Sequence, residues 1–285
     1  MTLALQTLIN VVILAAIYIL MGLGFAFILN LLGIFNLAHG SIFMLGGYVC
    51  YALIKGLHLN NWVSFPITII VCGLFGILVE RLLFRPFKGE FNRTTMVCIA
   101  VSTILVTTSN LRAGTKTLAI PSFISGTVGL GALRVQRDYL FAFVTAVVVL
   151  GLIIAFVKRS KWGAQMQAIT QNREGAALQG VRFGRIAALT CGIGFSLAGI
   201  AGVFMGTLYY LSPFMGDAAL VKVLMLTILA GFGSFDGIFI VGVILGALYG
   251  ALPVVLPGAV VDATASILVL VLLLFRPRGF FGYEL

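Results

Sequence analysis

The sequence predicts an all-α polytopic membrane protein with about eight transmembrane helices, and three observations predict it. Apolar residues make up 61% of the 285-residue chain and charged residues only 9%. A soluble domain carries roughly 25% charged residues, so these charges are too few to cover a water-exposed surface. The apolar residues form continuous runs near the roughly 20 residues that cross a bilayer as a helix, without the period-two alternation of a membrane β-barrel.

The apolar runs place the membrane spans in order along the chain. No charge precedes Lys55, and no basic segment precedes the first run. The first run is therefore expected to be a retained span rather than a cleaved signal peptide. We expect spans at about residues 8–29, 40–55, 62–80, 94–111, 139–157 and 186–211, a pair of shorter helices at 219–231 and 237–252, and a last span at 261–275.

The basic residues indicate the orientation. Of the 18 lysines and arginines, four lie in residues 81–93, six in 158–185 and two in the tail after the last span. Five lie in segments that would face the other side, and Lys222 lies within a short helix. Because basic loops stay on the cytoplasmic side, the N-terminus is expected outside and the C-terminus inside. The same distribution explains the net charge of +10 without a nucleic-acid partner.

Two glycine-rich breaks interrupt the apolar runs. Residues 33–40, Gly-Ile-Phe-Asn-Leu-Ala-His-Gly, precede a helix too short to cross the bilayer. Residues 231–237, Gly-Phe-Gly-Ser-Phe-Asp-Gly, divide 219–252 into halves, and neither half is expected to span the roughly 30 Å core. Discontinuous helices of this kind are typical of transport paths, because irregular backbone in a membrane must face protein or a water-filled cavity. The alternative is that the glycines only allow close helix packing.

Polar residues near these breaks are candidates for lining a substrate path. Ser102 and Thr103 begin a polar face of the span 94–111, which either lines the path or forms interhelical hydrogen bonds. Lys222 has three alternatives, which are to reach the outer surface, to pair with Asp217 or to meet a substrate carboxylate. The path candidates are Asn36, His39, Gly40, Ser102, Thr103, Gly231, Gly233 and Ser234.

Catalytic and nucleotide-binding motifs are missing from the sequence. It has no GxxxxGK[ST] phosphate loop, no GxGxxG after a strand, no HExxH and no GxSxG. The four cysteines lie in apolar runs without a CxxC pair, so we expect small buried side chains rather than metal or redox chemistry. The spans also lack the buried acids of ion-coupled carriers. We therefore expect no enzyme, and any energy for transport would come from a partner.

The longest basic segment, residues 158–185, contains a short motif typical of a capped helix. Asn172 can cap the start of this helix, Glu174 suits its positive end, and Gly180 can end it in the left-handed conformation. Such a helix either passes motion from a soluble motor protein to the membrane helices or rests on lipid headgroups.

Several motifs, in the same order, resemble the permease subunits of ABC importers for branched-chain amino acids, the LivH type. Asn36-Leu37-Ala38-His39-Gly40 is similar to the family's Asn-Phe-Ala-His-Gly-Glu, with Ser41 in place of the glutamate. Gly231–Ser234 and Phe275–Gly279 also resemble family segments, and the resemblance extends over about residues 15–282. The family's coupling pattern is matched at Gln171, Asn172, Glu174, Ala176, Leu178 and Gly180, with departures at Arg173, Gly175 and Ala177.

The resemblance implies a single transmembrane permease domain over residues 1–285, with a cytoplasmic coupling-helix loop at about 158–185. It implies a subunit of an ATP-driven importer that moves branched-chain or related amino acids across the cell inner (plasma) membrane. The alternative is a stand-alone channel or ion-coupled carrier for small polar solutes such as urea or amides.

The resemblance also implies partners. These are a second, LivM-like permease subunit or a second copy of this chain, two cytoplasmic ABC ATPase subunits and an extracytoplasmic solute-binding protein, all arranged around the lipid bilayer. The ATPase subunits would bind ATP with Mg, whereas this chain would hold no cofactor. The matched residues of the coupling pattern would dock on the ATPase subunits.

Overall fold

The computed structural model describes residues 2–87, 89–114, 116–130, 133–231, 234–276 and 279–281, and it is almost entirely helical. The helices are α1 (Thr2–Leu32), α2 (His39–Tyr51), α3 (Asn61–Val79), α4 (Phe91–Ala113), α5 (Arg137–Arg159), α6 (Lys161–Gln171), α7 (Arg173–Leu178), α8 (Phe183–Leu208), α9 (Met215–Ala230), α10 (Phe235–Ala251) and α11 (Gly258–Phe275).

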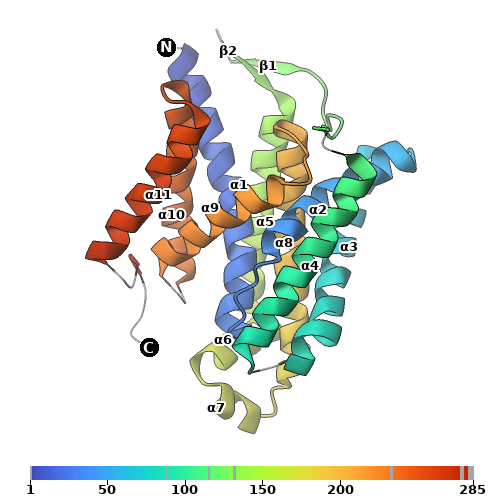
Figure 1. Cartoon of the computed structure of the whole chain (residues 1–285), viewed down its shortest axis with the longest axis vertical. Helices are drawn as coiled ribbons and strands as arrows, with labels where there is room; N and C mark the ends of the chain where they lie inside the picture. The colour runs from blue at the N-terminus through green and yellow to red at the C-terminus, as the bar shows by residue number, and fades with distance from the viewer. Residues whose placement is uncertain are drawn as a thin grey trace.

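Seven helices in the described part of the chain are long and apolar enough to cross a bilayer, which confirms the all-α polytopic fold. They are Ala4–Leu32, Asn61–Phe87, Phe91–Ala113, Arg137–Arg159, Phe183–Leu208, Phe235–Val254 and Gly258–Phe275. Two further helices within the apolar part of the chain, α2 and α9, are too short to cross a bilayer, and they lie next to the two breaks found in the sequence. In Figure 1, α1, α5 and α8 run along the long axis, whereas α9 crosses the bundle obliquely.

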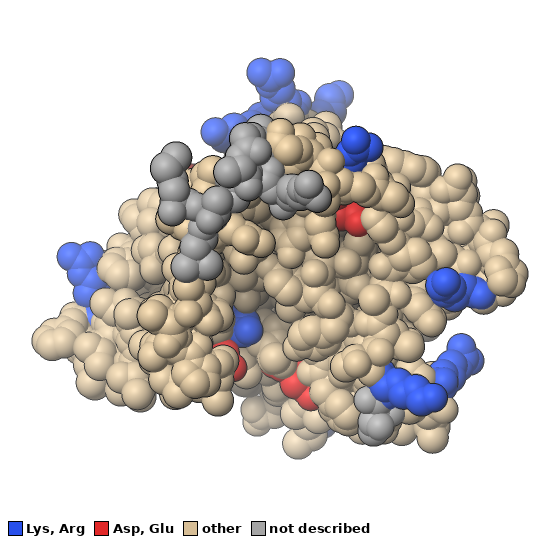
Figure 2. Space-filling view, turned by 90° about the horizontal axis from the view of Figure 1, so that it is seen from above, with Lys and Arg blue, Asp and Glu red and all other residues tan. Residues whose placement is uncertain are grey.

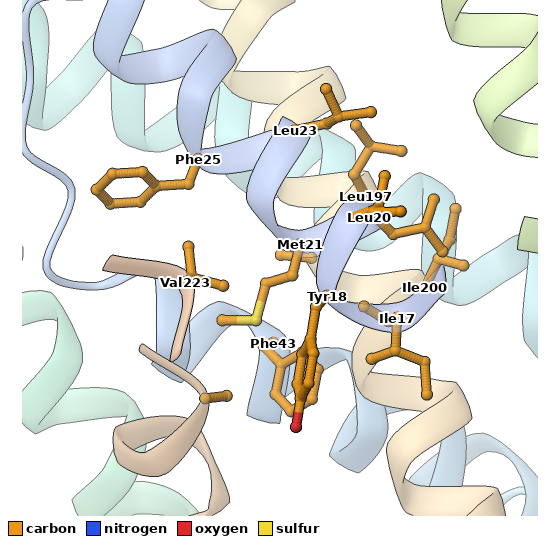
Figure 3. Close-up of a cluster of buried hydrophobic side chains, with 14 of the residues drawn as sticks. Ile17, Tyr18, Leu20, Met21, Leu23, Phe25, Phe43, Leu197, Ile200 and Val223 are labelled. Carbon is orange, nitrogen blue, oxygen red and sulfur yellow. The ribbon is translucent and has the colours of Figure 1, made fainter. Parts of the chain in front are cut away.

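The bundle is built around α1 and α8. The most apolar stretch of α1 is 89% buried and that of α8 83% buried, against 11% for α5. A helix that is apolar on every side can be surrounded by lipid or by other helices, and α1 is surrounded by other helices. Figure 3 shows this for α1, whose side chains from Ile17 to Phe25 point outward around the helix toward Phe43 of α2, Leu197 of α8 and Val223 of α9.

The outer helices expose apolar rather than charged side chains. The most apolar stretches of α4 and α11 are each only 17% buried. The apolar sides of these outer helices are solvated by lipid or covered by another membrane protein. Figure 2 views the molecule from the end where α1 begins, and the Lys and Arg groups visible there lie mainly around its edge.

The segment between α4 and α5 is more ordered than the sequence suggests. It forms a hairpin of β1 (Thr127–Leu130) and β2 (Leu133–Gln136), in which Thr127 pairs with Gln136. The buried carboxylate of Asp138 accepts hydrogen bonds from the backbone N–H groups of Phe123 and Ile124, both at 3.0 Å. The loop is thereby attached to the start of α5. Figure 1 shows the hairpin at the opposite end from α6 and α7.

One expectation for the second break is wrong. We expected that neither half of 219–252 spans the membrane, but α10 continues through a 3-10 turn to Val254 and reaches 20 residues. At 1.5 Å per residue this is about 30 Å, enough to cross the bilayer core. The helix is longer than expected because it begins directly after Ser234 and does not end at the apolar boundary near 252. Only α9, with 16 residues, is short.

Candidate functional site

The first break lies deep in the membrane part of the fold. After α1 ends at Leu32, Gly33 adopts a positive φ of 69° and the chain turns back. His39, the first residue of α2, then donates a hydrogen bond from Nε2 to the Met21 carbonyl oxygen at 3.1 Å. Met21 lies three turns before the end of α1, about 16 Å away. The irregular segment therefore returns to mid-membrane depth, as the sequence predicts.

Two polar side chains of this break are fully buried and only partly satisfied. Asn36 Oδ1 accepts a hydrogen bond from the Ala38 N–H at 3.1 Å, but Asn36 Nδ2 has no partner among the described residues. A carbonyl can only accept, so His39 Nε2 carries the proton and Nδ1 is an acceptor. That Nδ1 also has no partner in the described part of the chain. The break thus holds one free donor and one free acceptor, both shielded from water.

The two short helices meet at glycines. A Cβ atom on Gly40 would lie 2.1 Å from the Gly216 carbonyl oxygen, and one on Gly216 would lie 2.5 Å from the Gly40 carbonyl oxygen. Since real side chains never come this close, both positions require glycine. Gly40 therefore brings the start of α2 against the start of α9, beside Asn36 and His39.

The predicted residues of α4 fall in two different places. Ser102 Oγ is 2.6 Å from Ser41 Oγ, so it joins α4 to α2 close to the break. Thr103 is exposed, and its hydroxyl donates to the Ile99 carbonyl oxygen of its own helix at 2.9 Å. The structure brings Ser102 to the break and leaves Thr103 on the outer face of the bundle.

Local hydrogen bonds hold the second break in place, and a pocket of about 320 Å³ lies beside its residues Ser234 and Asp236. Gly231 ends α9 with a φ of 88°, and the Ser234 hydroxyl accepts a hydrogen bond from the Gly237 N–H at 3.0 Å, which caps α10. The backbone N–H groups of Phe280 and Phe281 donate to the carbonyl oxygens of Leu229 and Ala230. The polar groups of Gly231 and Ser234 thus have local roles in ending and starting helices. Gly233 lies outside the described residues.

A cavity of about 260 Å³ opens beside the first break, at the end of the bundle where α1 ends. Its wall contains Glu80, which is 3% exposed, and Arg85, which donates to both Glu80 carboxylate oxygens at 2.8 and 3.1 Å. Glu80 was not among the site residues predicted from the sequence. The lining residues are Leu32, Gly33, Ile34, Phe35, Glu80, Phe84, Arg85, Gly89, Glu90, Phe91, Thr94, Thr95, Phe183, Gly184 and Ala187.

The predicted short helix is present as α7 at the far end of the molecule (Figure 1). The Asn172 side chain accepts a hydrogen bond from the Gly175 N–H at 2.8 Å, Glu174 lies in the first turn, and Gly180 has a φ of 80°. These are the caps that the sequence predicts. The preceding helix α6, which ends at Gln171, was not anticipated.

The same short helix has one buried and one exposed side. Ala176 is 5% exposed and packs with Met166 and Ile186, whereas Leu178 is 88% exposed. Gln171, Asn172 and Glu174 are also exposed. A capped helix that is attached by a buried alanine and presents a leucine to the solvent has the geometry of a docking element.

Lys222 of α9 pairs with a different acid from the one considered in the sequence. Its Nζ atom lies 3.8 Å from Asp262 Oδ1 of α11 and 4.2 Å from the ring centre of Tyr249 of α10. Its charge is therefore held between three helices. Asp217, the partner considered from the sequence, is exposed.

Discontinuous membrane helices that meet at mid-membrane, together with an exposed capped helix beyond the bundle, define a membrane transport protein of the permease class. The chain belongs to the family described as branched-chain amino acid transport system / permease component, whose model matches residues 7–276.

Named relatives extend over nearly the whole chain. The high-affinity branched-chain amino acid transport system permease protein LivH of Escherichia coli K12 is 29% identical over 98% of this chain and 95% of the relative. The permease protein BraD of Pseudomonas aeruginosa shows the same identity and coverage. The probable branched-chain amino acid transport permease protein LivH of Methanocaldococcus jannaschii is 24% identical over 82% of this chain and 76% of the relative.

A solved structure shares the fold. PsaBC from Streptococcus pneumoniae, in complex with Fab, aligns with a TM-score of 0.53 over 96% of this chain and 93% of that chain. The two sequences are 15% identical, so this similarity concerns the fold alone.

Proposed function

We propose that this chain is a permease subunit of an ATP-driven importer for branched-chain or related amino acids. The match to the permease family along residues 7–276 carries this proposal. The proposed assembly contains a second permease, which is a LivM-like chain or another copy, two cytoplasmic ATPase subunits that bind ATP with Mg, and an extracytoplasmic solute-binding protein. Its location is the cell inner membrane, with the N-terminus outside and the C-terminus inside.

The proposed docking element for the ATPase subunits is α7. Ala176 is packed against the membrane helices, so a force on the exposed side of α7 reaches α8 through the core that contains Ile186. Leu178 would enter an apolar pocket of the ATPase, because an 88% exposed leucine next to a capped helix offers a single apolar anchor. Gln171, Asn172, Glu174 and Gly180 would keep the helix short and rigid.

The proposed substrate path passes the first break. An amino acid carries a carboxylate, which accepts hydrogen bonds, and an ammonium group, which donates them. The free donor on Asn36 and the free acceptor on His39 are complementary to these two groups. In the described conformation both side chains are fully buried, so access to them requires α2 and α9 to separate near Gly40 and Gly216.

The coupling assignment is tested by Leu178→Glu and Glu174→Pro in the complete transporter. Both residues are exposed, so membrane insertion should be unchanged. Leu178→Glu should lower amino-acid uptake and the substrate-stimulated ATP hydrolysis by at least about fivefold, because a charge replaces an apolar anchor. Leu57→Glu is the matched control, since Leu57 is an exposed leucine beyond α2.

Normal uptake by Leu178→Glu and by Glu174→Pro would remove α7 from the coupling mechanism. Solute flux through the purified chain in vesicles without ATPase subunits would instead favour the stand-alone channel or carrier.

A further inference from the structure

A second pocket, which we call the basic interfacial pocket, lies between the start of α6 and the segment that leads into α8. Its volume is about 340 Å³. Three of its lining side chains are basic and none is acidic. The lining residues are Lys161, Trp162, Gln165, Gly180, Arg182 and Arg185.

The basic groups of this pocket lie at the ends of two membrane spans. Lys161 follows Arg159, the last residue of α5, by two positions. Arg182 directly precedes α8, and Arg185 lies in its first turn. Both helices are long and apolar enough to cross the bilayer, so the pocket lies at the depth of the lipid headgroups. Trp162 is 45% exposed there, as expected for an aromatic side chain at a membrane interface.

The charges of the pocket have no counter-charge within the described part of the chain. The ion pairs found there join Arg85 to Glu80, Arg93 to Glu90 and Lys222 to Asp262. None of them includes a residue of the basic interfacial pocket. Three cations around one hollow repel one another, and an anion between them removes that repulsion.

We propose that the basic interfacial pocket binds the phosphate-bearing headgroup of an anionic phospholipid. A phosphate diester accepts hydrogen bonds from several Arg and Lys donors at once. The depth of the pocket and the exposed Trp162 favour a lipid over a free phosphate ion, because the acyl chains would extend along the apolar end of α5, where Leu152 and Ile154 are exposed. Gly180, which ends α7, is part of the same pocket, so a bound headgroup would hold the α7–α8 linker.

Tryptophan fluorescence provides a direct test, because the chain has two tryptophans. Trp62 lies at the start of α3, so Trp62→Phe leaves Trp162 as the reporter inside the pocket. This variant is placed in phosphatidylcholine vesicles that contain a small fraction of brominated phosphatidylglycerol, or in the same vesicles with brominated phosphatidylcholine. Bromine quenches tryptophan on contact. The anionic bromolipid should quench Trp162 at least about twofold more strongly than the zwitterionic one.

Charge variants in the same background identify the site. Arg182→Gln combined with Arg185→Gln should remove the preference for the anionic lipid. If this double variant is not recovered folded, the single variant Lys161→Gln is measured in its place and should lower the same preference. Arg112→Gln with Lys116→Gln also removes two charges, but from the last turn of α4 and the segment after it, and should keep the preference. Trp162→Phe, which leaves Trp62, should show a smaller preference.

Three outcomes overturn the proposal. Equal quenching by the two bromolipids would mean that the pocket does not bind anionic lipid. An acidic protein surface would then be the counter-charge of the pocket. A preference that survives in the charge variants would place the lipid elsewhere. A preference that disappears when millimolar inorganic phosphate replaces chloride at equal ionic strength would mean that the pocket selects a free anion.

Discussion

Asn36 and His39 each keep a buried polar atom without a partner in the described part of the chain. Such an atom costs roughly 1–3 kcal/mol of folding free energy, because its hydrogen bond to water is lost and not replaced. An apolar side chain of similar size would avoid this cost. In the proposed substrate path, these two atoms, one a donor and one an acceptor, would contact the substrate.

Replacing either residue by leucine tests whether it serves transport or the fold. We expect Asn36→Leu and His39→Leu to lower amino-acid uptake by about tenfold, the effect of one lost hydrogen bond to a charged group. The melting temperature of the purified chain should stay within a few degrees of the parent, because the loss of Ala38 N–H and Met21 carbonyl bonds is offset by removal of the unpartnered atoms.

Thr190→Val is the matched control for these variants. Thr190 is equally buried, but its hydroxyl is satisfied by the Ile186 carbonyl oxygen of its own helix at 2.8 Å. Uptake should be unchanged in this variant. A strong loss of thermal stability in Asn36→Leu or His39→Leu, with uptake reduced only in proportion to the folded protein, would show that these side chains serve the fold.

At the residue scale, the sequence predicts sites that depend on local composition. Asn36 and His39 stand out because polar residues are rare within apolar runs, and the caps at Asn172 and Gly180 follow from local backbone geometry. Glu80 and Arg85 are only five residues apart, but their position beside the first break could not be predicted, because it depends on how the end of α3 packs against α8, where Arg85 donates to the Gly184 carbonyl oxygen. Thr103 was grouped with Ser102, although neighbouring helical residues point about 100° apart.

At the scale of the elements, many glycines lie where two helices come into close contact. Gly242, Gly246 and Gly250 lie four residues apart on α10 and face Ile19, Ala15 and Val11 of α1. A Cβ atom on Gly246 would lie 2.6 Å from the backbone Cα and N atoms of Ala15. Without a hydrophobic force between helices in lipid, such close approach supplies the packing energy that holds α10 on α1.

A single added methyl group tests this interface. We expect Gly246→Ala to destabilise the purified chain by about 1–3 kcal/mol, because α1 and α10 must move apart to admit it. Gly151→Ala in α5 is the matched control, since no heavy atom lies within 4 Å of its Cβ position. The control should be neutral or gain up to about 1 kcal/mol, because alanine favours the helix. Equal melting temperatures for the two variants would contradict the interface.

The helices inside the membrane could be predicted from the sequence, because the bilayer restricts which segments can cross it. Each expected span overlaps an observed helix, because a crossing segment needs continuous apolar residues and satisfied backbone groups. Outside the membrane, the caps of α7 predicted that helix, whereas α6 and the β1–β2 hairpin were not found. These two elements are short and depend on tertiary contacts such as the Ala176 core and the Asp138 carboxylate.

At the scale of the whole molecule, the helices divide into a buried centre and an exposed exterior. α1 and α8 form the centre, and the short helices α2 and α9 start beside it, whereas α4, α5 and α11 are largely exposed. A second permease or lipid can cover these exposed faces without changing the centre. The hairpin and α7 lie at opposite ends (Figure 1), so the proposed solute-binding protein and ATPase subunits would contact different ends of the bundle.

The proposed orientation of the chain rests on the distribution of basic residues and can be measured directly. The four cysteines of the chain are buried, so a membrane-impermeant maleimide should leave the parent protein unlabelled in intact cells. Lys116→Cys introduces an exposed thiol after α4, and Gln179→Cys introduces one after α7. Because 158–185 carries six basic residues, we expect Lys116→Cys to be labelled in intact cells and Gln179→Cys only after permeabilisation. The reverse labelling pattern would show the opposite orientation, with α7 outside the cell. In that orientation α7 could not contact cytoplasmic ATPase subunits.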